Sequence, residues 1–273
     1  MVHNRGTARI ARGPALRSAL VAGASTLVVG VLVVLVVTRS PGWPRVRETF
    51  LSPEDFRAAF PQVLEGLWLN VRIFLVAEPL ILALGLPIAV ARSLRAPVFL
   101  PLRVLGTAYV DLFRGLPAIL VIFVVGFGVP ALRLRGVPTD PVVLGVIALV
   151  LTYGAYVAEV FRAGIESVEH GQRAAARSLG LTHAQELRYV VLPQAVRRVV
   201  PPLLNDFVSL QKDTALVAVI GPLEAMRQAQ VYASGTFNYT AYLAAALLFV
   251  LLTVPMARLT DALTARTARK RGP

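Results

Sequence analysis

The sequence predicts an all-α membrane protein with six transmembrane helices. Of its 273 residues, 56% are apolar and only 16% are charged, whereas soluble domains carry about 25% charged residues. The apolar stretches reach about 20 residues or more, and at about 1.5 Å per residue each can cross a hydrocarbon core of roughly 30 Å. A soluble globular fold is therefore excluded.

The basic excess of the chain is explained by membrane orientation. The formal net charge is +13, from 28 Lys and Arg against 15 Asp and Glu. Most of the Arg residues lie in short segments on one side of the predicted spans, and such basic flanks face the cytoplasm. We therefore expect both termini in the cytoplasm and no nucleic-acid partner.

The chain has no cysteine and only three histidines. The absence of cysteine excludes disulfides, thiolate zinc sites and iron–sulfur clusters, and three scattered histidines argue against an imidazole metal site. We expect neither a metal site nor redox chemistry in this chain.

The first span covers residues 19–37 and follows a cytoplasmic basic segment, 1–18. A cleaved signal would be shorter and would end in small residues, whereas this stretch ends in Thr38-Arg39-Ser40-Pro41, so we interpret it as a retained anchor. Residues 38–65 then form an external segment. Ser52 and Pro53 predict the start of an amphipathic helix on the outer membrane surface, and a loop packed onto the other helices is the alternative.

The remaining spans are separated by short loops and one long one. They cover residues 66–91, 98–129, 141–161, 203–221 and 240–259. The third of the six spans is expected to bend near Gly115 and Pro117. Residues 260–273 form a basic cytoplasmic tail.

The long inner loop, about 164–202, is predicted to contain two short helices. Gly180 suits the left-handed conformation that ends a helix, and Thr182 with Gln185 forms a capping-box pattern. The second helix carries Leu187 and is expected to end at Pro193. Two helices presented to the cytoplasm in this way predict a docking element for a soluble partner.

This loop resembles the EAA loop of ABC importer permeases. The family pattern is Glu-Ala-Ala, three residues, Gly, nine residues, an aliphatic residue, any residue, and Leu-Pro. The chain has every spacing, with Ala in place of the family Glu at position 174. The residues that the resemblance assigns to coupling with an ATPase subunit are Ala174, Ala175, Ala176, Gly180, Leu192 and Pro193.

Three further segments resemble those of polar amino acid permeases. Residues 109–117 are similar to the stretch from Tyr to Phe-Arg-Gly-Thr-Pro, with Leu116 in place of Thr. Residues 155–165 and 210–216 also resemble segments of that subfamily. The resemblance runs from about 66 to 259 and implies a type I ABC importer permease core of five helices, preceded by one N-terminal helix.

The resemblance implies a transport subunit rather than an enzyme, in the bacterial cytoplasmic (inner) membrane. Its expected partners are a second permease subunit (a copy or a paralogue), two ABC ATPase subunits, an external solute-binding protein and membrane lipid. ATP and Mg²⁺ are expected on the ATPase subunits, because neither Lys212 nor Lys270 follows Gly as a phosphate-binding loop requires. This chain itself is expected to bind no cofactor.

Charged residues inside the spans need a partner or a polar pathway. Asp111 with Arg114, and Glu159 with Arg162, have the spacing of structural ion pairs on one helix. Glu78 lies near the membrane midplane, where it either contacts a substrate ammonium group or ties two helices together.

Three adjacent polar residues are further candidates for the substrate pathway. Lys212, Asp213 and Thr214 point in different directions around the fifth span, so at least one is expected to face the pathway. The sequence does not identify the amino acid, and another small polar solute stays an alternative. A secondary transporter is a weaker alternative, because no inverted repeat is evident and it would not need the loop at Gly180.

Overall fold

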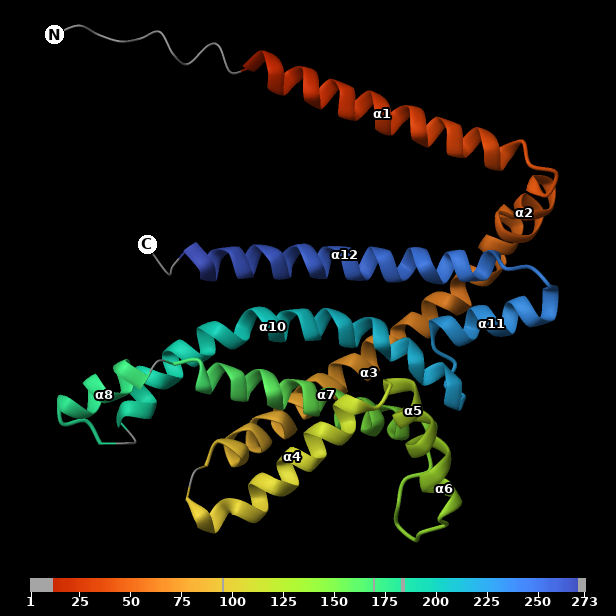
Figure 1. Cartoon of the computed structure of the whole chain (residues 1–273). Coiled ribbons are helices and arrows are strands. Elements are labelled where there is room, and N and C mark those ends of the chain that lie inside the picture. The colour runs from red at the N-terminus through yellow and green to blue at the C-terminus, as the bar shows by residue number, and fades with distance from the viewer. Residues whose placement is uncertain (1–11, 95, 169, 183–184, 270–273) are drawn as a thin grey trace, which may run out of the picture. The chain divides into compact units, whose positions relative to one another are not determined.

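The computed structural model describes residues 12–94, 96–168, 170–182 and 185–269, and in these ranges it is helical with no strand (Figure 1). The outer parts of both predicted tails, 1–11 and 270–273, lie outside the described residues. The chain divides into two units, Met1–Ser52 and Pro53–Pro273. Each unit is described by itself below.

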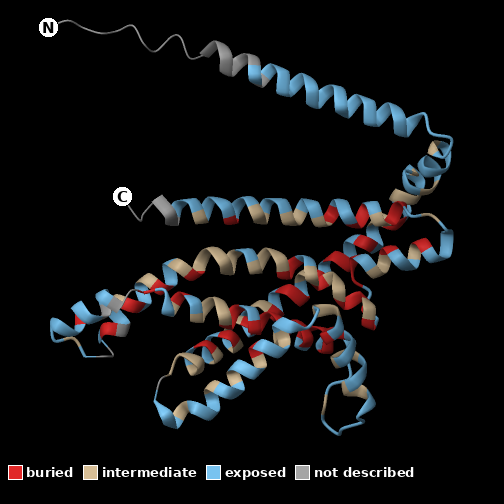
Figure 2. Ribbon diagram, in the orientation of Figure 1, coloured by how far each residue is buried: buried red, intermediate tan, exposed pale blue. Residues whose placement is uncertain are grey.

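The first unit consists of α1 (Arg12–Thr38) and α2 (Trp43–Phe50). Its apolar stretch, Leu20–Thr38, is long and apolar enough to cross a membrane and is exposed along its length (Figure 2). This stretch closely matches the predicted span, 19–37. An apolar helix with no protein partner in its own unit is the form that lipid accommodates, because lipid replaces the missing apolar contacts.

The second unit begins with α3 (Pro53–Ser93), which is 41 residues long. The structure has no separate surface helix at 52–65, because the residues predicted to form it are the first turns of α3. Ala59 and Val63 are buried against Ala225 and Leu248 from later helices. This arrangement is closer to the alternative of a segment packed onto the other helices. Packing overrides Pro61, which α3 includes without a break.

The third predicted span is broken into short helices. They are η1 (Pro97–Phe99), α4 (Leu100–Gly115), α5 (Ala118–Phe123), η2 (Val124–Gly128) and α6 (Val129–Ala131). The two halves are bent by 106° between Gly115 and Ala118. Leu116 is extended there and Pro117 follows, because a residue before proline is disfavoured in the helical region. The predicted bend at Gly115 and Pro117 is confirmed.

The last elements complete the bundle. They are α7 (Pro141–Glu166), α8 (His170–Ser178), η3 (Glu186–Val191), α10 (Leu192–Asp213), η4 (Thr214–Ile220), α11 (Ala225–Thr236) and α12 (Thr240–Arg269). Among the described residues, four helical stretches are long and apolar enough to cross a membrane, or five if the bent pair counts as one span. The predicted count of six is not confirmed, because residues 203–221 divide between α10 and the 3₁₀ helix η4.

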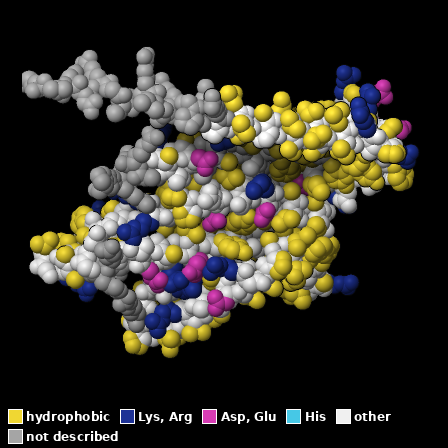
Figure 3. Space-filling view, turned by 45° about the horizontal axis from the view of Figure 1, so that its top comes forward, with side chains coloured by type: hydrophobic (Ala, Val, Ile, Leu, Met, Phe, Trp, Pro, Cys, Tyr) yellow, Lys and Arg dark blue, Asp and Glu magenta, His cyan; other side chains and the backbone are white. Residues whose placement is uncertain are grey.

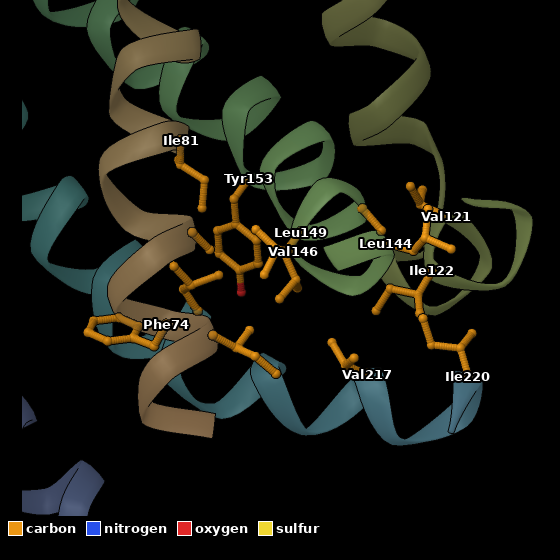
Figure 4. Close-up of a cluster of buried hydrophobic side chains, with 14 of the residues drawn as sticks. Phe74, Ile81, Val121, Ile122, Leu144, Val146, Leu149, Tyr153, Val217 and Ile220 are labelled. Atoms are coloured by element: carbon orange, nitrogen blue, oxygen red, sulfur yellow. The ribbon is translucent and has the colours of Figure 1, made fainter. Parts of the chain in front are cut away.

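The main apolar core lies where α3, α5, α7 and η4 meet (Figure 4). Ile81 of α3, Ile122 of α5, Leu149 of α7 and Val217 of η4 are almost completely buried in it. Segments far apart in sequence are therefore fixed to one another at this point.

The connections of the second unit gather at its two ends (Figure 1). The turn between α3 and α4, helix α8 and the C-terminal end of α12 lie at one end. Helix α11 and the segment from α5 to α6 lie at the other. The loops predicted to be inner and outer are thus separated, as a chain that crosses a membrane repeatedly requires.

A close backbone approach joins α3 to α11 at Gly66. A Cβ atom at Gly66 would lie 2.6 Å from the backbone nitrogen of Ala225, which is too close for any side chain. Gly66→Ala is therefore expected to push the helices apart and to destabilise the protein by about 1 to 3 kcal/mol. The measurement is the midpoint of thermal unfolding in detergent. Gly23→Ala, in α1 where the surrounding space is open, is the control, and equal midpoints for both variants would contradict the expectation.

Candidate functional site

The inner loop contains the turn that the sequence predicts after α8. Gly180 has a φ of +81°, and its backbone nitrogen donates to Arg177 O at 2.9 Å. The backbone nitrogen of Leu181 donates to Ala176 O at 3.2 Å, so the free carbonyls at the end of α8 are paired. Gly180 thus adopts the predicted left-handed conformation.

The predicted capping box follows this turn. The backbone nitrogen of Thr182 donates to Gln185 Oε1 at 2.9 Å, and that of Gln185 donates to Thr182 Oγ1 at 3.3 Å. The two residues between them lie outside the described ranges. Pro193 does not end the second helix as predicted. It is the second residue of α10, and the π helix η3 (Glu186–Val191) continues directly into α10, so the helix runs on through Pro193.

An ion pair ties the two arms of the loop together. Arg177 Nε of α8 lies 3.5 Å from Glu186 Oε2 of η3, and the Glu186 side chain is almost completely buried. The backbone hydrogen bonds at the end of α8 and the ion pair between α8 and η3 therefore both stabilise the turn at Gly180. The loop has a defined conformation.

The loop exposes several apolar side chains that sequence reasoning found only in part. Ala174 and Ala175 are exposed, whereas Ala176 is buried and supports the helix from inside. Leu179 is 82% exposed and Tyr189 63% exposed, although neither was predicted as a site residue. Exposed large apolar side chains beside a glycine turn are the available signal for a contact surface. Leu192 and Pro193 are also exposed.

A network of charged side chains lies near this inner end, centred on Glu159 of α7. Glu159 Oε2 accepts from Arg92 Nη1 of α3 at 2.8 Å, and Glu159 also pairs with Arg162. Arg114 Nη1 of α4 lies 3.9 Å from the same carboxylate. Glu159 therefore joins three helices through its charged partners. Figure 3 shows that Lys, Arg, Asp and Glu side chains also gather on an otherwise largely apolar face.

The predicted ion pair between Asp111 and Arg114 does not form. The Arg114 guanidinium lies 5.8 Å from the centre of the Tyr156 ring and turns toward α7, where Glu159 is its acid partner. Asp111 makes no ion pair with any described residue. Tertiary contacts between α4 and α7 outweigh the local spacing of the pair, because a half-buried partner and a ring face are both available there.

The three adjacent polar residues at the end of α10 separate as their spacing requires. Lys212 is exposed and borders an apolar groove between α10 and α12. Asp213 Oδ2 accepts a hydrogen bond of 2.8 Å from the Tyr153 hydroxyl of α7. Thr214 is fully buried, and its hydroxyl donates to Gln211 O and accepts from Asn70 Nδ2. Thr214 is therefore part of the helix packing.

Asn70 and Glu224 form a buried polar junction that the sequence analysis missed. Asn70 Nδ2 of α3 donates to Glu224 Oε2 at 3.0 Å, and Asn70 Oδ1 accepts from the backbone nitrogen of Ala225. The Glu224 carboxylate also accepts from the backbone nitrogens of Met226 and Arg227, which caps α11. Burial raises the pKa of the Glu224 carboxyl, whereas these hydrogen bonds favour its charged form. A polar Asn inside an apolar span was the signal.

Glu78 of α3 has an acidic neighbour. Asp206 of α10 lies within electrostatic range of Glu78, and Tyr153 is within range of both Asp206 and Asp213. Asp206 Oδ2 is buried and has no hydrogen-bond partner among the described residues. Acidic side chains of α3 and α10 therefore lie beside Tyr153 of α7: Glu78 is near Asp206, and Tyr153 is near both Asp206 and Asp213. The sequence analysis missed Asp206, although it is a carboxylate inside a predicted span.

Comparison with known proteins matches most of the second unit to a transport family. A family model described as binding-protein-dependent transport system inner membrane component matches residues 81–269. The probable glutamine ABC transporter permease protein GlnM of Bacillus subtilis (strain 168) is 38% identical over 198 residues, which cover 72% of this chain and 89% of that protein. The arginine transport system permease protein ArtQ of the same organism is 35% identical over 188 residues, or 68% and 84% of the two chains.

Solved structures have the same fold. The chain matches the crystal structure of an amino acid ABC transporter with histidines at a TM-score of 0.69 and 32% identity, over 76% of this chain and 94% of the other. An inward-facing structure of the MetNI methionine ABC transporter matches at a TM-score of 0.62 and 20% identity, over 75% and 95%. This second match concerns the fold alone.

The buried junction of Asn70 and Glu224 is expected to stabilise the folded protein. Glu224→Ala removes the cap of α11 and one acceptor of the buried Asn70 amide, so we expect a loss of about 2 kcal/mol in stability. The control is Asp140→Ala, because Asp140 caps α7 from an exposed position by accepting from the backbone nitrogen of Val143. The midpoint of thermal unfolding in detergent should fall clearly further for Glu224→Ala. A larger fall for the exposed cap would show that the junction does not stabilise the helix packing.

Proposed function

The chain belongs to the family of binding-protein-dependent transport system inner membrane components, and we propose that it forms, with a second permease subunit, the membrane pathway of an ATP-driven importer for a polar amino acid. As a permease subunit of an ABC amino acid importer it is not an enzyme, and ATP hydrolysis belongs to its partner. The chain is a multi-pass membrane protein.

The observation that supports this proposal most is the ordered loop at Gly180, which exposes apolar side chains at the inner end of the bundle. We assign the contact with the ATPase subunits to Ala174, Ala175, Gly180, Leu192 and Pro193, with Ala176 supporting them from inside. The exposed side chains of Leu179 and Tyr189 extend that surface. Because Arg177 and Glu186 hold its two arms, movement of an ATPase subunit is transmitted to α7 and α10 as a unit.

The complete transporter in this proposal has two permease subunits, two ATPase subunits that hold ATP and Mg²⁺, and an external solute-binding protein. The second permease subunit is a copy of this chain or a paralogue. Relatives named for glutamine and arginine transport, and a solved amino acid transporter with histidines, support a polar amino acid as substrate.

We assign the substrate contact to the acidic region between α3, α7 and α10. Glu78 and Asp213 are the predicted pathway residues that the fold brings to this region, and Asp206 adds a third carboxylate. Every amino acid carries an α-ammonium group, and a carboxylate is the natural partner for that charge. Lys212 borders a separate groove, and we keep it as a pathway residue that does not contact the substrate in the acidic region. Thr214 is buried and positions the end of α10.

The orientation of the chain is part of the proposal. We place the end that carries α8 in the cytoplasm of a bacterium and the end that carries α11 outside the cytoplasmic membrane. The support is the concentration of Arg residues in the loops at the α8 end.

Gly180 provides a test of the coupling role. Gly180→Val forces a β-branched side chain into a left-handed backbone conformation, so the angle between α8 and η3 should change. We expect normal membrane insertion, a loss of most ATPase co-purification and a loss of solute-stimulated ATP hydrolysis.

Gly136→Val is the matched control for this experiment. Gly136 has a φ of +80° and lies in open space, as Gly180 does, but it lies in the segment between α6 and α7. Local backbone strain is therefore similar, and only the Gly180 variant should lose coupling. If both variants kept ATPase co-purification and solute-stimulated ATP hydrolysis to the same extent, the loop at Gly180 would not be the ATPase contact.

Glu78 tests the substrate assignment. Glu78→Gln keeps the size of the side chain and removes its charge, so uptake of a cationic or zwitterionic amino acid should fall on the order of tenfold in kcat/KM. The measurement is uptake into proteoliposomes that contain the complete transporter. Glu65→Gln, an exposed position of the same helix, should behave as wild type. Unchanged uptake of all tested amino acids by Glu78→Gln would refute the assignment.

Two single cysteines test the orientation, because the chain has no cysteine of its own. A membrane-impermeant thiol reagent should label Ser234→Cys in α11 of intact cells and should label Ser178→Cys in α8 only after lysis. Both positions are exposed in the structure. The reverse labelling pattern would invert the proposed topology.

A further inference from the structure

A polar cavity of about 550 Å³ lies at the inner end of the bundle, between α3, α4 and α7. Its charged lining consists of Arg92 from the end of α3, Arg103 and Asp111 from α4, and Arg162 from α7. None of its lining residues belongs to the acidic region or to the loop at Gly180, so neither role described above uses it.

One cation of the cavity lining, Arg103, forms no ion pair with any described residue. Arg92 and Arg162 share the Glu159 carboxylate, and Arg162 also pairs with Glu166. Arg103 is half-buried and has no hydrogen-bond or ion-pair partner in the part of the chain that the structure describes. An Arg left without an acid beside two further Arg side chains is arranged to receive an anion.

The backbone adds to this preference. Arg103 lies in the first turn of α4, a helix of 16 residues, and no side chain caps its N-terminus. The N-terminus of a helix carries partial positive charge, which favours a bound anion. Thr107, one turn further along the same face, contributes a hydroxyl that accepts from Arg92 Nε at 3.4 Å and is within reach of the cavity.

The rim of the cavity is apolar and favours an anion that is part of a lipid. Leu100 and Val104 line the cavity and are more than half exposed. Val98 and Leu105 extend this exposed apolar surface over the start of α4. These side chains border the cavity with apolar surface, so an anion that carries an acyl chain gains contacts here that a free phosphate cannot make. Basic pockets between helices on the cytoplasmic side of a membrane have the chemistry to bind anionic headgroups.

We propose that this cavity binds the headgroup of an anionic phospholipid of the phosphatidylglycerol type, with the phosphate at Arg103 and one acyl chain along Leu100 and Val104. Asp111 lies two turns from Arg103 on α4, roughly 12 Å along the helix axis, and the two side chains form no ion pair. Its carboxylate accepts a hydrogen bond from a headgroup hydroxyl. The bound lipid fixes the turn between α3 and α4 against α7.

The test is native mass spectrometry of the purified complex of this chain with its ATPase subunits. The added probes are short-chain phosphatidylglycerol, short-chain phosphatidylcholine and inorganic phosphate. We expect wild-type protein to bind phosphatidylglycerol in preference to phosphatidylcholine, and Arg103→Gln to weaken that binding about tenfold. Arg103→Lys keeps the charge and should retain most of the preference.

Arg258→Gln is the matched control, because Arg258 is an exposed cation on α12 without a described partner. Its lipid binding should equal that of wild type. Four results would overturn the proposal: unchanged lipid binding by Arg103→Gln, equal binding of both lipids, displacement of the lipid by inorganic phosphate at the same concentration, or loss of the ATPase subunits from Arg103→Gln with lipid binding intact. This inference does not depend on which solute is transported.

Discussion

The hydrogen-bonded contact of α3 with α11, through Asn70 and Glu224, is the interaction on which the rest of the second unit depends. Lipid supplies no hydrogen bonds, so a polar group inside a membrane protein has to find its partner in the protein. Asn70 meets this requirement by joining Glu224, Thr214 and the backbone of Ala225 in one network. Because α3 also packs against α4, α7, α10 and α12, that network fixes the helix that organises the bundle.

At the inner end of the unit, charged side chains join the helices in a similar way. Glu159 joins α3, α4 and α7, and the Arg198 guanidinium donates to Ser167 O, which links α10 to the end of α7. The loop at Gly180 projects from α7 and α10, the two helices tied in this way. The loop is therefore linked to the helices that carry Tyr153, Asp206 and Asp213. In the proposed function, these contacts connect the ATPase contact to the substrate pathway.

Local sequence signals predicted the parts of the fold that local chemistry determines. Gly180, Thr182 and Gln185 form the turn and cap that their residue types favour, and Pro117 marks the bend in the third span. Tertiary packing decided the rest. α3 continues through Pro61 because the apolar face of its first turns is buried by later helices. The chain is also helical on both sides of Pro193, where η3 runs directly into α10.

The site residues divide in the same way. Glu159 and Arg162 pair at their helical spacing, but Arg114 leaves Asp111 for a partner on α7, which no single-helix spacing could reveal. Thr214 is buried because it meets Asn70 from a helix far away in sequence. Asp206 could not be predicted as a site residue from the sequence, because its acidic and aromatic neighbours, Glu78 and Tyr153, lie on other helices.

We propose that the exposed apolar side chains beside Gly180 contact an ATPase subunit. Site-specific photo-crosslinking tests this contact most directly. A photo-reactive amino acid replaces Leu179, which is 82% exposed at this surface, or Phe237, which is 78% exposed at the opposite end of the unit. In the assembled transporter, irradiation should link position 179 to an ATPase subunit and position 237 to none. Linkage of the ATPase subunit through position 237, with none through position 179, would contradict the account.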